Sequence, residues 1–376
     1  LVRRFYSKLT RTYLWSMVMN KKVLLYCLLL NIIGLIMVYS SSSIWAKYKF
    51  NDSFRYLKFQ GIFMLVGLII IKIISKIDMN FIKKKANTLL FICLILIILV
   101  LIPGIGKVRN GSRSWFGIGS LGIQPSEFIK IALIIFTSKY LENNKKEMKK
   151  IKDGVLPILL LTLVIFGLIM LEPDLGTGTI ITVTIIAMLF VSGVKMSFFT
   201  LLGILGLLGI AGLIIIAPYR VNRILSFIDP WKDPLGTGFQ IIQSLYAIGP
   251  GSLFGLGLGG SRQKHFYLPE PQTDFIFSII CEELGFIGGS IVVVLFALLT
   301  YEGFKISRKS NDLFQKYLAF GLTFSLAFQS SLNLMVVVGL IPVTGVTLPF
   351  LSYGGSSLLI SMTSIGLLLN ISKNIR

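Results

Sequence analysis

Residues 269–285 read PEPQTDFIFSIICEELG, and three of their four carboxylates lie at or just inside the start of a long apolar stretch. Asp274 lies at the mouth of this stretch, and Glu282 and Glu283 lie about two helical turns inside it. Charged side chains are costly in hydrocarbon and usually mark function. Asp274 has two interpretations: it caps the helix that follows, or it is a general base at the membrane–water boundary, where partial burial lifts the pKa of a carboxylate.

A second acid, Glu127, opens another apolar stretch. Pro125 and Glu127 fit the first turn of a helix, and Lys130 follows Glu127 at a spacing that allows an ion pair. The preceding segment contains Arg113, which can bind phosphate through two hydrogen bonds, and Trp115, which can stack on a sugar. These residues indicate either an ordinary helix start or one side of a substrate pocket.

Glu282 and Glu283 are adjacent, so on a helix their side chains point about 100° apart and cannot both face one partner. We expect a structural pair, in which one acid binds a basic residue on another span, or a water-filled cavity. A proton relay is the functional alternative.

Two segments between apolar stretches are unusually long, and both contain cations. Arg220 and Arg223 lie in the second of them. Such cations can bind a membrane-anchored diphosphate or simply contact lipid head groups, and charge alone does not separate the two. The chain has no Walker loop, no His/Cys metal spacing and no Ser-His-Asp signature.

The elements that position these residues are apolar helices. The chain is 54% hydrophobic and only 14% charged, whereas soluble domains usually carry about 25% charged residues. Runs near the ~20 residues needed to cross a bilayer recur along the sequence. We therefore predict an all-α polytopic membrane protein of about ten spans, at 23–43, 57–75, 87–102, 124–141, 155–171, 176–192, 199–217, 275–300, 315–338 and 348–371.

The net charge of +21 is unevenly distributed. If ten spans are threaded with residues 1–22 inside, most Lys and Arg fall in inside segments, which places both termini in the cytoplasm. This pattern indicates contact with anionic lipid rather than nucleic acid. The long segments 103–123 and 218–274 then lie outside. The second separates spans seven and eight and contains an amphipathic piece, Phe239–Ile248. We predict one integral-membrane domain over residues 1–376, with its chemistry at the outer face.

The sequence contains five distinctive motifs, which are RSWFGIGSLGIQPSEFIK (113–130), EPDLGTG (172–178), PYRVNRILSFIDPWKDPLGTGFQ (218–240), LPEPQTDFIFSIICEELGFIGG (268–289) and NLMVVVGLIPVTGVTLPFLSYGGSS (333–357). Together they resemble the SEDS family of bacterial shape, elongation, division and sporulation proteins. LPEPQTDF and LIMVYSSSS are most similar to the FtsW/SpoVE branch of this family. The resemblance covers essentially the whole chain. It implies a ten-span fold and a peptidoglycan glycosyltransferase of the bacterial plasma membrane. It further implies an outward-facing site that polymerises lipid II, a class B penicillin-binding protein as partner, and a divalent cation, Mg²⁺ or Mn²⁺.

The resemblance also assigns roles to individual residues. Asp274 matches the essential aspartate of the family and would be the general base, and Glu127 matches a functional glutamate. Arg113, Trp115 and Lys130 match positions near the substrate, whereas Gly354 and Gly355 match small residues where spans pack closely. Gln272 stands where many relatives carry a histidine.

Several points stay open at this stage. Arg220 and Arg223 are candidates for the diphosphate, and Asp274 and Glu127 are both candidates to bind the cation. A lipid II flippase and a non-catalytic scaffold for the transpeptidase are the alternative functions.

Overall fold

The structure is a computed structural model that describes residues 20–109, 111–118, 121–216, 227–236, 238–373 and 375. Arg220 and Arg223 lie outside the described residues. Within these ranges, one helix corresponds to each predicted apolar stretch. The helices are α2 (Lys21–Phe50), α3 (Arg55–Ile74), α4 (Met79–Leu101), α5 (Pro125–Asn143), α6 (Leu156–Leu171), α7 (Leu175–Val191), α8 (Met196–Ile216), α11 (Ile276–Lys309), α12 (Leu313–Val337) and α13 (Gly355–Ser372).

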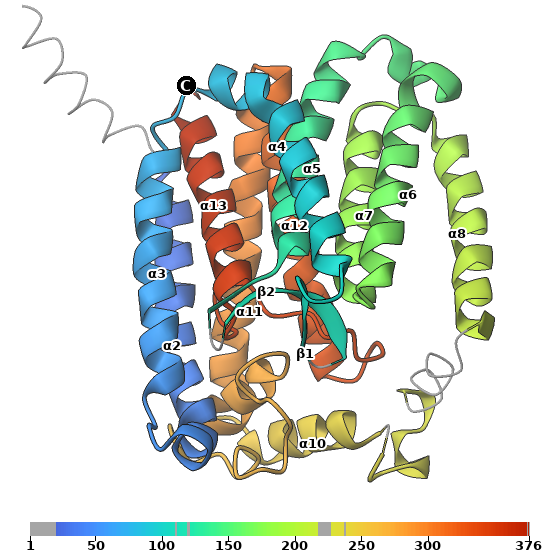
Figure 1. Cartoon of the computed structure of the whole chain (residues 1–376). Helices are drawn as coiled ribbons and strands as arrows, with labels where there is room; N and C mark the ends of the chain where they lie inside the picture. The colour runs from blue at the N-terminus through green and yellow to red at the C-terminus, as the bar shows by residue number, and fades with distance from the viewer. Residues whose placement is uncertain are drawn as a thin grey trace, which may run out of the picture.

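The helices run alongside one another between two ends of the molecule (Figure 1). In the described part of the chain, seven helices are long and apolar enough to cross a membrane, and α7 and part of α8 are shorter apolar helices. The all-α polytopic class is therefore confirmed, while the number of ten spans stays a prediction.

One end of the bundle, which we call the basic end, carries the lysine-rich connections and residue 375. Asn20, Asp78 and Asp312 cap α2, α4 and α12 there, because each side chain accepts a backbone N–H of the first helical turn. Lys83 and Glu142 form an ion pair across the α4–α5 pair. This clustering of cations is the feature from which the sequence predicts a cytoplasmic end.

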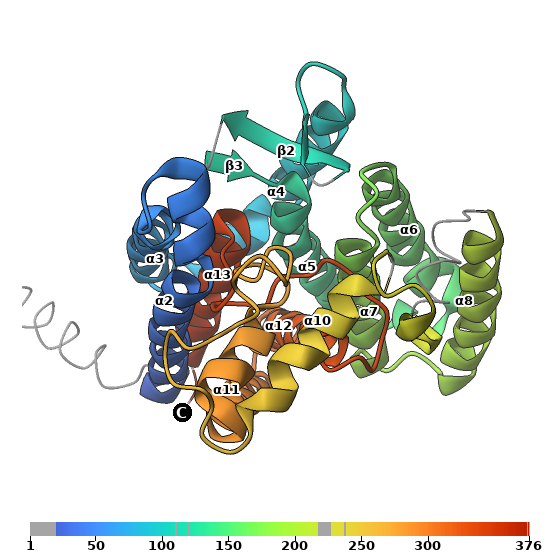
Figure 2. The same ribbon diagram turned by 90° about the horizontal axis from the view of Figure 1, so that it is seen from below.

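The opposite end, which we call the loop end, contains the two long connections. The first forms a small antiparallel sheet of β1 (Lys107–Arg109), β2 (Ser112–Ile118) and β3 (Leu121–Ile123), which the sequence analysis did not predict. The second contains α10 (Phe239–Ile248), whose bounds match the predicted amphipathic piece. Figure 2, which looks at this end, shows α10 lying across the ends of the vertical helices.

Small residues bring the helices into close contact, as expected where helices associate without a hydrophobic driving force. A Cβ on Gly34 of α2 would collide with the backbone of Phe350 and Leu351, and one on Gly321 of α12 would collide with Met188 and Ile134. The same holds for Gly355, where a Cβ would meet the Phe63 ring of α3. The expected packing role of Gly355 is thus visible, whereas neighbouring Gly354 has extended backbone (φ 175°) and more room.

Two predicted spans are wrong in detail. The last was placed at 348–371, but α13 begins only at Gly355, because Pro342, Pro349 and two glycines keep residues 340–354 irregular. The eighth is predicted at 275–300, whereas α11 continues to Lys309 and is interrupted at Gly285, where φ is 66° and ψ is −165°. Both irregular regions lie near the residues singled out for chemistry.

Candidate active site at the loop end

Asp274 does not cap α11. The N-cap position belongs to Phe275, which makes no side-chain cap bond, so the capping interpretation is wrong. The neighbouring Thr273 hydroxyl is directed backward and donates to the carbonyl of Glu270 at 2.9 Å. The half-buried Asp274 carboxylate is therefore not engaged in helix capping.

The backbone around Asp274 is held by α12 and by residues 340–354. The Asn333 side-chain amide donates 2.7 Å hydrogen bonds to the carbonyls of Asp274 and Val346. The Ser352 hydroxyl donates to the carbonyl of Thr273 at 2.6 Å. A Cβ on Gly345, whose φ is 74°, would lie 3.8 Å from Asp274 Oδ2, which places this carboxylate beside a glycine. The backbone that carries the carboxylate is thus fixed, and the neighbouring Gly345 has no side chain that would cover it.

The electrostatic surroundings of Asp274 suit a base that works near neutral pH. Burial is the largest effect, and the negative charges of Glu270 and Asp174 add to it. Together they raise the pKa of Asp274 to about 7. A carboxylate with this pKa is substantially ionised at neutral pH and still binds a proton readily.

Asp174 connects the surroundings of Asp274 to Glu127. Its Oδ1 accepts the backbone N–H of Thr177 at 2.9 Å, and its Oδ2 accepts from the Gln124 side chain at 3.1 Å. Burial raises the pKa of Asp174, hydrogen bonds from Thr177 lower it, and the charge of Glu127 raises it further. In the sequence, Asp174 is marked only by its place in the EPDLGTG motif, which does not predict a role for it.

Glu172 is a second acid that sequence reasoning missed. It is fully buried, and neither carboxylate oxygen has a hydrogen-bond partner in the described part of the structure. Burial, followed by the charge of Asp174, raises the pKa of Glu172 to about 8, well above the usual range of a glutamate. The Ser112 hydroxyl on β2 donates a hydrogen bond to the backbone carbonyl of Glu172, and this bond connects the small sheet to the turn between α6 and α7.

The predicted Glu127–Lys130 ion pair is present. The Lys130 ammonium lies 2.9 Å from Glu127 Oε2 and donates to Gln329 Oε1 at 2.7 Å. Gln329 in turn donates to the carbonyl of Thr347 at 3.0 Å. Both charged side chains are buried, and Pro125 lies at the start of α5 as expected. The pair therefore joins α5, α12 and residues 340–354, and Gln329 was not foreseen.

Arg113 and Trp115 lie on β2, two residues apart and therefore on one face of the strand. In the sheet register, Trp115 is paired with Lys107 and Arg113 with Val108. The sheet is attached to α13 through Ser356, whose hydroxyl donates to the carbonyl of Gly122 on β3 at 3.3 Å. The strand brings both side chains to the loop end, where their binding role stays a prediction.

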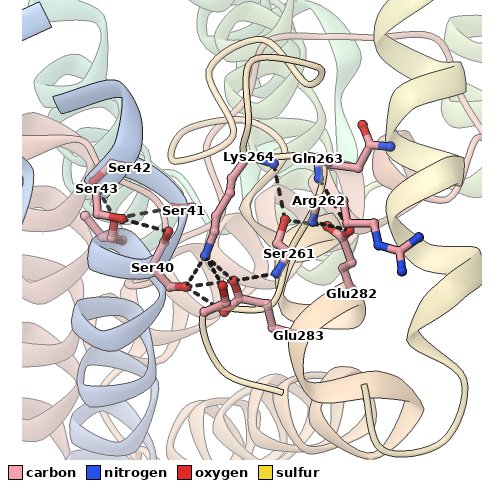
Figure 3. Close-up of polar contacts among 12 residues, drawn as sticks. Ser40, Ser41, Ser42, Ser43, Ser261, Arg262, Gln263, Lys264, Glu282 and Glu283 are labelled. Carbon is pink, nitrogen blue, oxygen red and sulfur yellow. Dashed lines mark hydrogen bonds and ion pairs between the residues drawn. The ribbon is translucent and has the colours of Figure 1, made fainter. Parts of the chain in front are cut away.

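Glu282 and Glu283 form a buried structural network (Figure 3). The Glu282 carboxylate accepts from the Ser261 hydroxyl and from the backbone N–H of Arg262 at 2.8 Å. The Glu283 carboxylate accepts from Ser40 of α2 and forms a 3.0 Å ion pair with Lys264. The two acids share one partner, contrary to the expectation from their spacing: the Ser261 hydroxyl donates to Glu282 and the Ser261 backbone N–H donates to Glu283 Oε1 at 3.3 Å. The basic partner, Lys264, lies in the long connection rather than on another span.

No metal site can be built from protein ligands alone among the described residues, since no three His, Cys, Asp or Glu side chains gather in suitable positions. A cation that takes one or two carboxylates and completes its shell with substrate oxygens is compatible with this donor set.

The fold and site define a polytopic helical membrane protein with a group of carboxylates at one end, one of which has a near-neutral pKa. The chain belongs to the FtsW/RodA/SpoVE family, described as cell cycle proteins, whose family model matches residues 21–376.

Named relatives agree with this membership. Stage V sporulation protein E of Bacillus subtilis is 52% identical over 346 residues, which cover 92% of this chain and 94% of that protein. A probable peptidoglycan glycosyltransferase FtsW of Trichlorobacter lovleyi is 41% identical, with 94% and 93% covered. The predicted resemblance to the family is confirmed.

Solved structures show the same fold. One is a peptidoglycan synthase complex, studied for its coordination of polymerization and crosslinking. It matches with a TM-score of 0.80 at 30% identity, covering 95% of this chain and 98% of that one. The rod shape determining protein RodA of Thermus thermophilus matches with a TM-score of 0.71 at 27% identity, covering 95% and 97%.

Proposed function

We propose that this protein is a peptidoglycan glycosyltransferase that polymerises lipid II into glycan strands at the outer face of the bacterial plasma membrane. The observation that carries the proposal is Asp274, a half-buried carboxylate with a pKa of about 7, held at the loop end of a multi-pass membrane protein. Relatives named as probable peptidoglycan glycosyltransferases and as a sporulation protein support this activity, in division or in sporulation.

In the proposed reaction, Asp274 removes the proton from the 4-hydroxyl of the acceptor sugar. The resulting oxygen attacks the anomeric carbon of the donor glycan, a new glycosidic bond forms, and the bond to undecaprenyl diphosphate breaks. An α-linked donor gives a β-linked product, so one base suffices and no covalent enzyme intermediate is needed. Asn333 and Ser352 position the base by holding the backbone on which it is carried.

The leaving diphosphate requires positive charge. Lys130 is already paired with Glu127 inside the bundle, so we assign it mainly to positioning that acid and Gln329. Arg113, half-buried on β2, and the predicted cations Arg220 and Arg223 are the proposed diphosphate ligands. Asp274 or Glu127 would hold a divalent cation, Mg²⁺ or Mn²⁺, which would supply positive charge to the leaving diphosphate.

We further propose that a class B penicillin-binding protein is the partner that crosslinks the product. The support is the likeness to a peptidoglycan synthase complex that coordinates polymerization with crosslinking. A lipid II flippase could use the intramembrane glutamates Glu282 and Glu283 and a polar cavity. Their engagement with Ser261, Lys264 and Ser40 favours a structural role instead.

A paired assay separates the three candidate functions. The purified protein is reconstituted with lipid II, and both glycan chain length and lipid II translocation are measured, with and without the transpeptidase. We expect glycan chains. Translocation without chain growth would indicate a flippase, and neither activity in a folded preparation with its partner would indicate a scaffold.

A further inference from the structure

The interruption of α11 at Gly285 is filled by a second segment of the chain. Residues 249–261 read GPGSLFGLGLGGS, and their backbone binds the groups that the break leaves unpaired. The hydrogen bonds run from Leu256 N to Glu282 O (2.9 Å), Gly257 N to Glu283 O (3.0 Å), Phe286 N to Ser252 O (2.8 Å) and Ile287 N to Leu253 O (3.2 Å). The broken helix and the glycine-rich segment therefore complete each other's backbone hydrogen bonding.

This backbone contact depends on glycine at both sides. Gly285 and Gly255 have φ values of 66° and 80°, a region that side chains rarely adopt. A Cβ on Gly285 would collide with the backbone of Leu253 and Gly255, and one on Gly251 would collide with the carbonyl of Cys281. The glycines of both segments therefore allow residues 249–261 to lie directly against the backbone of α11.

The far end of the same segment is fixed by the acidic network. Lys264 forms its ion pair with Glu283 and also donates to the carbonyl of Gly259 at 2.7 Å. Glu283 is bound to Ser40, so the network joins the segment to α2 as well as to α11 (Figure 3). The segment is thus held at both ends against two helices.

The outward side of the held segment is strongly apolar. Leu253, Phe254 and Leu258 are 57%, 77% and 61% exposed, and residues 249–261 contain no charged side chain. Because Leu253 is hydrogen-bonded to Ile287, this surface continues directly onto α11. There Phe286 is 68% exposed, and the exposed apolar side chains continue through Ile287, Ile291 and Val294. In a spanning helix such a face contacts lipid.

We propose that residues 252–258 are inserted into the hydrocarbon of the outer leaflet and that their partner is lipid acyl chains. An irregular segment is tolerated at that depth only if its backbone groups are satisfied, which the broken α11 achieves. The predicted large extracellular connection therefore includes a membrane-embedded part. Since the chain continues from Lys264 to Asp274, the insertion fixes the depth of the proposed catalytic carboxylate relative to the bilayer.

Spin-label accessibility tests this placement directly. Phe254→Cys is prepared in a Cys281→Ala background, in which the two remaining cysteines are buried. The labelled full-length protein in nanodiscs is exposed to oxygen, which concentrates in hydrocarbon, and to a water-soluble nickel chelate. Val294→Cys on the lipid-facing side of α11 is the apolar control, and Lys232→Cys, with an exposed side chain, is the aqueous control.

We expect the label at position 254 to match that at 294, with an oxygen-to-nickel accessibility ratio several-fold above that at 232. A ratio at 254 equal to that at 232 would overturn the proposal. Exclusion of both reagents from position 254 when the transpeptidase is present would also overturn it and would indicate a protein interface. The same accessibility ratio measured at Leu258→Cys is an independent check of the proposal. These measurements do not depend on glycosyltransferase activity, so they stand apart from the proposed function.

Discussion

The side-chain amide of Asn333 on α12 donates a 2.7 Å hydrogen bond to the backbone carbonyl of Asp274. The same nitrogen donates to Val346, so one amide fixes both the base and the segment beside it. The position of Asp274 is therefore determined by a residue that is distant in sequence and has no part in the proton transfer.

Replacing this amide should impair catalysis more than folding. Asn333→Ala leaves one partly buried and one buried carbonyl without this donor, at about 1–3 kcal/mol for each carbonyl that finds no other partner. Misplacement of a catalytic group by about 1 Å can cost about 100-fold in rate. We expect a fall in kcat of roughly 10- to 100-fold with modest loss of thermal stability. Asn87→Ala, at an exposed position near the basic end, is the matched control. Equal activity of both variants would remove Asn333 from the positioning role.

The pH dependence of the rate should follow Asp274. A base acts only when deprotonated, so kcat/KM should rise with pH through about 7 and level off above it. Glu270→Gln removes a negative charge that raises the pKa of Asp274, and the rising limb should therefore move to lower pH. A profile that is flat between pH 5 and 9 for the wild type, or a shift to higher pH for Glu270→Gln, would contradict this assignment.

The Glu127–Lys130 pair offers a double-mutant cycle. Removing one partner of a buried pair leaves an uncompensated charge and costs about 3–5 kcal/mol. Lys130→Met should therefore be strongly destabilised, and the Glu127→Gln/Lys130→Met double variant should recover much of that loss in thermal unfolding. Additive losses from the two changes would show that the buried pair is not coupled.

The interrupted helix should be sensitive to a single methyl group. Gly285→Ala places a Cβ at a positive φ, which costs about 1–3 kcal/mol, and into the backbone of Leu253. Gly203→Ala in α8 meets no neighbouring atom and is the matched control. We expect a clear drop in melting temperature for the first variant only. Similar melting curves would mean that the break tolerates a side chain.

Much of the fold could be predicted because a bilayer imposes simple constraints on sequence. Helices such as α2 and α12 were found from their apolar length, and the basic end from its lysines. The Glu127–Lys130 contact was predictable because residues three apart on a helix are neighbours.

The features of the fold and site that could not be predicted depend on contacts between segments that are distant in sequence. Nothing local marks Gly285 as a helix break, since its unpaired backbone groups are satisfied by residues around 252–257. Asp174, Gln329 and Asn333 gain their importance from partners that only the folded bundle brings together. The small sheet escaped prediction because its strands are only three to seven residues long and β2 and β3 each contain a glycine, a residue that strands usually avoid.

The most direct test of the central claim is glycan formation from purified lipid II by the wild type and by Asp274→Asn, resolved on a gel. Both are assayed with Mg²⁺ or Mn²⁺ and the partner transpeptidase, and Asp52→Asn, at an exposed surface pair with Lys58, controls for loss of a carboxylate at the loop end. We predict glycan chains from the wild type and Asp52→Asn, and none from a folded Asp274→Asn. Near-normal chains from Asp274→Asn would contradict the assignment of Asp274 as the base.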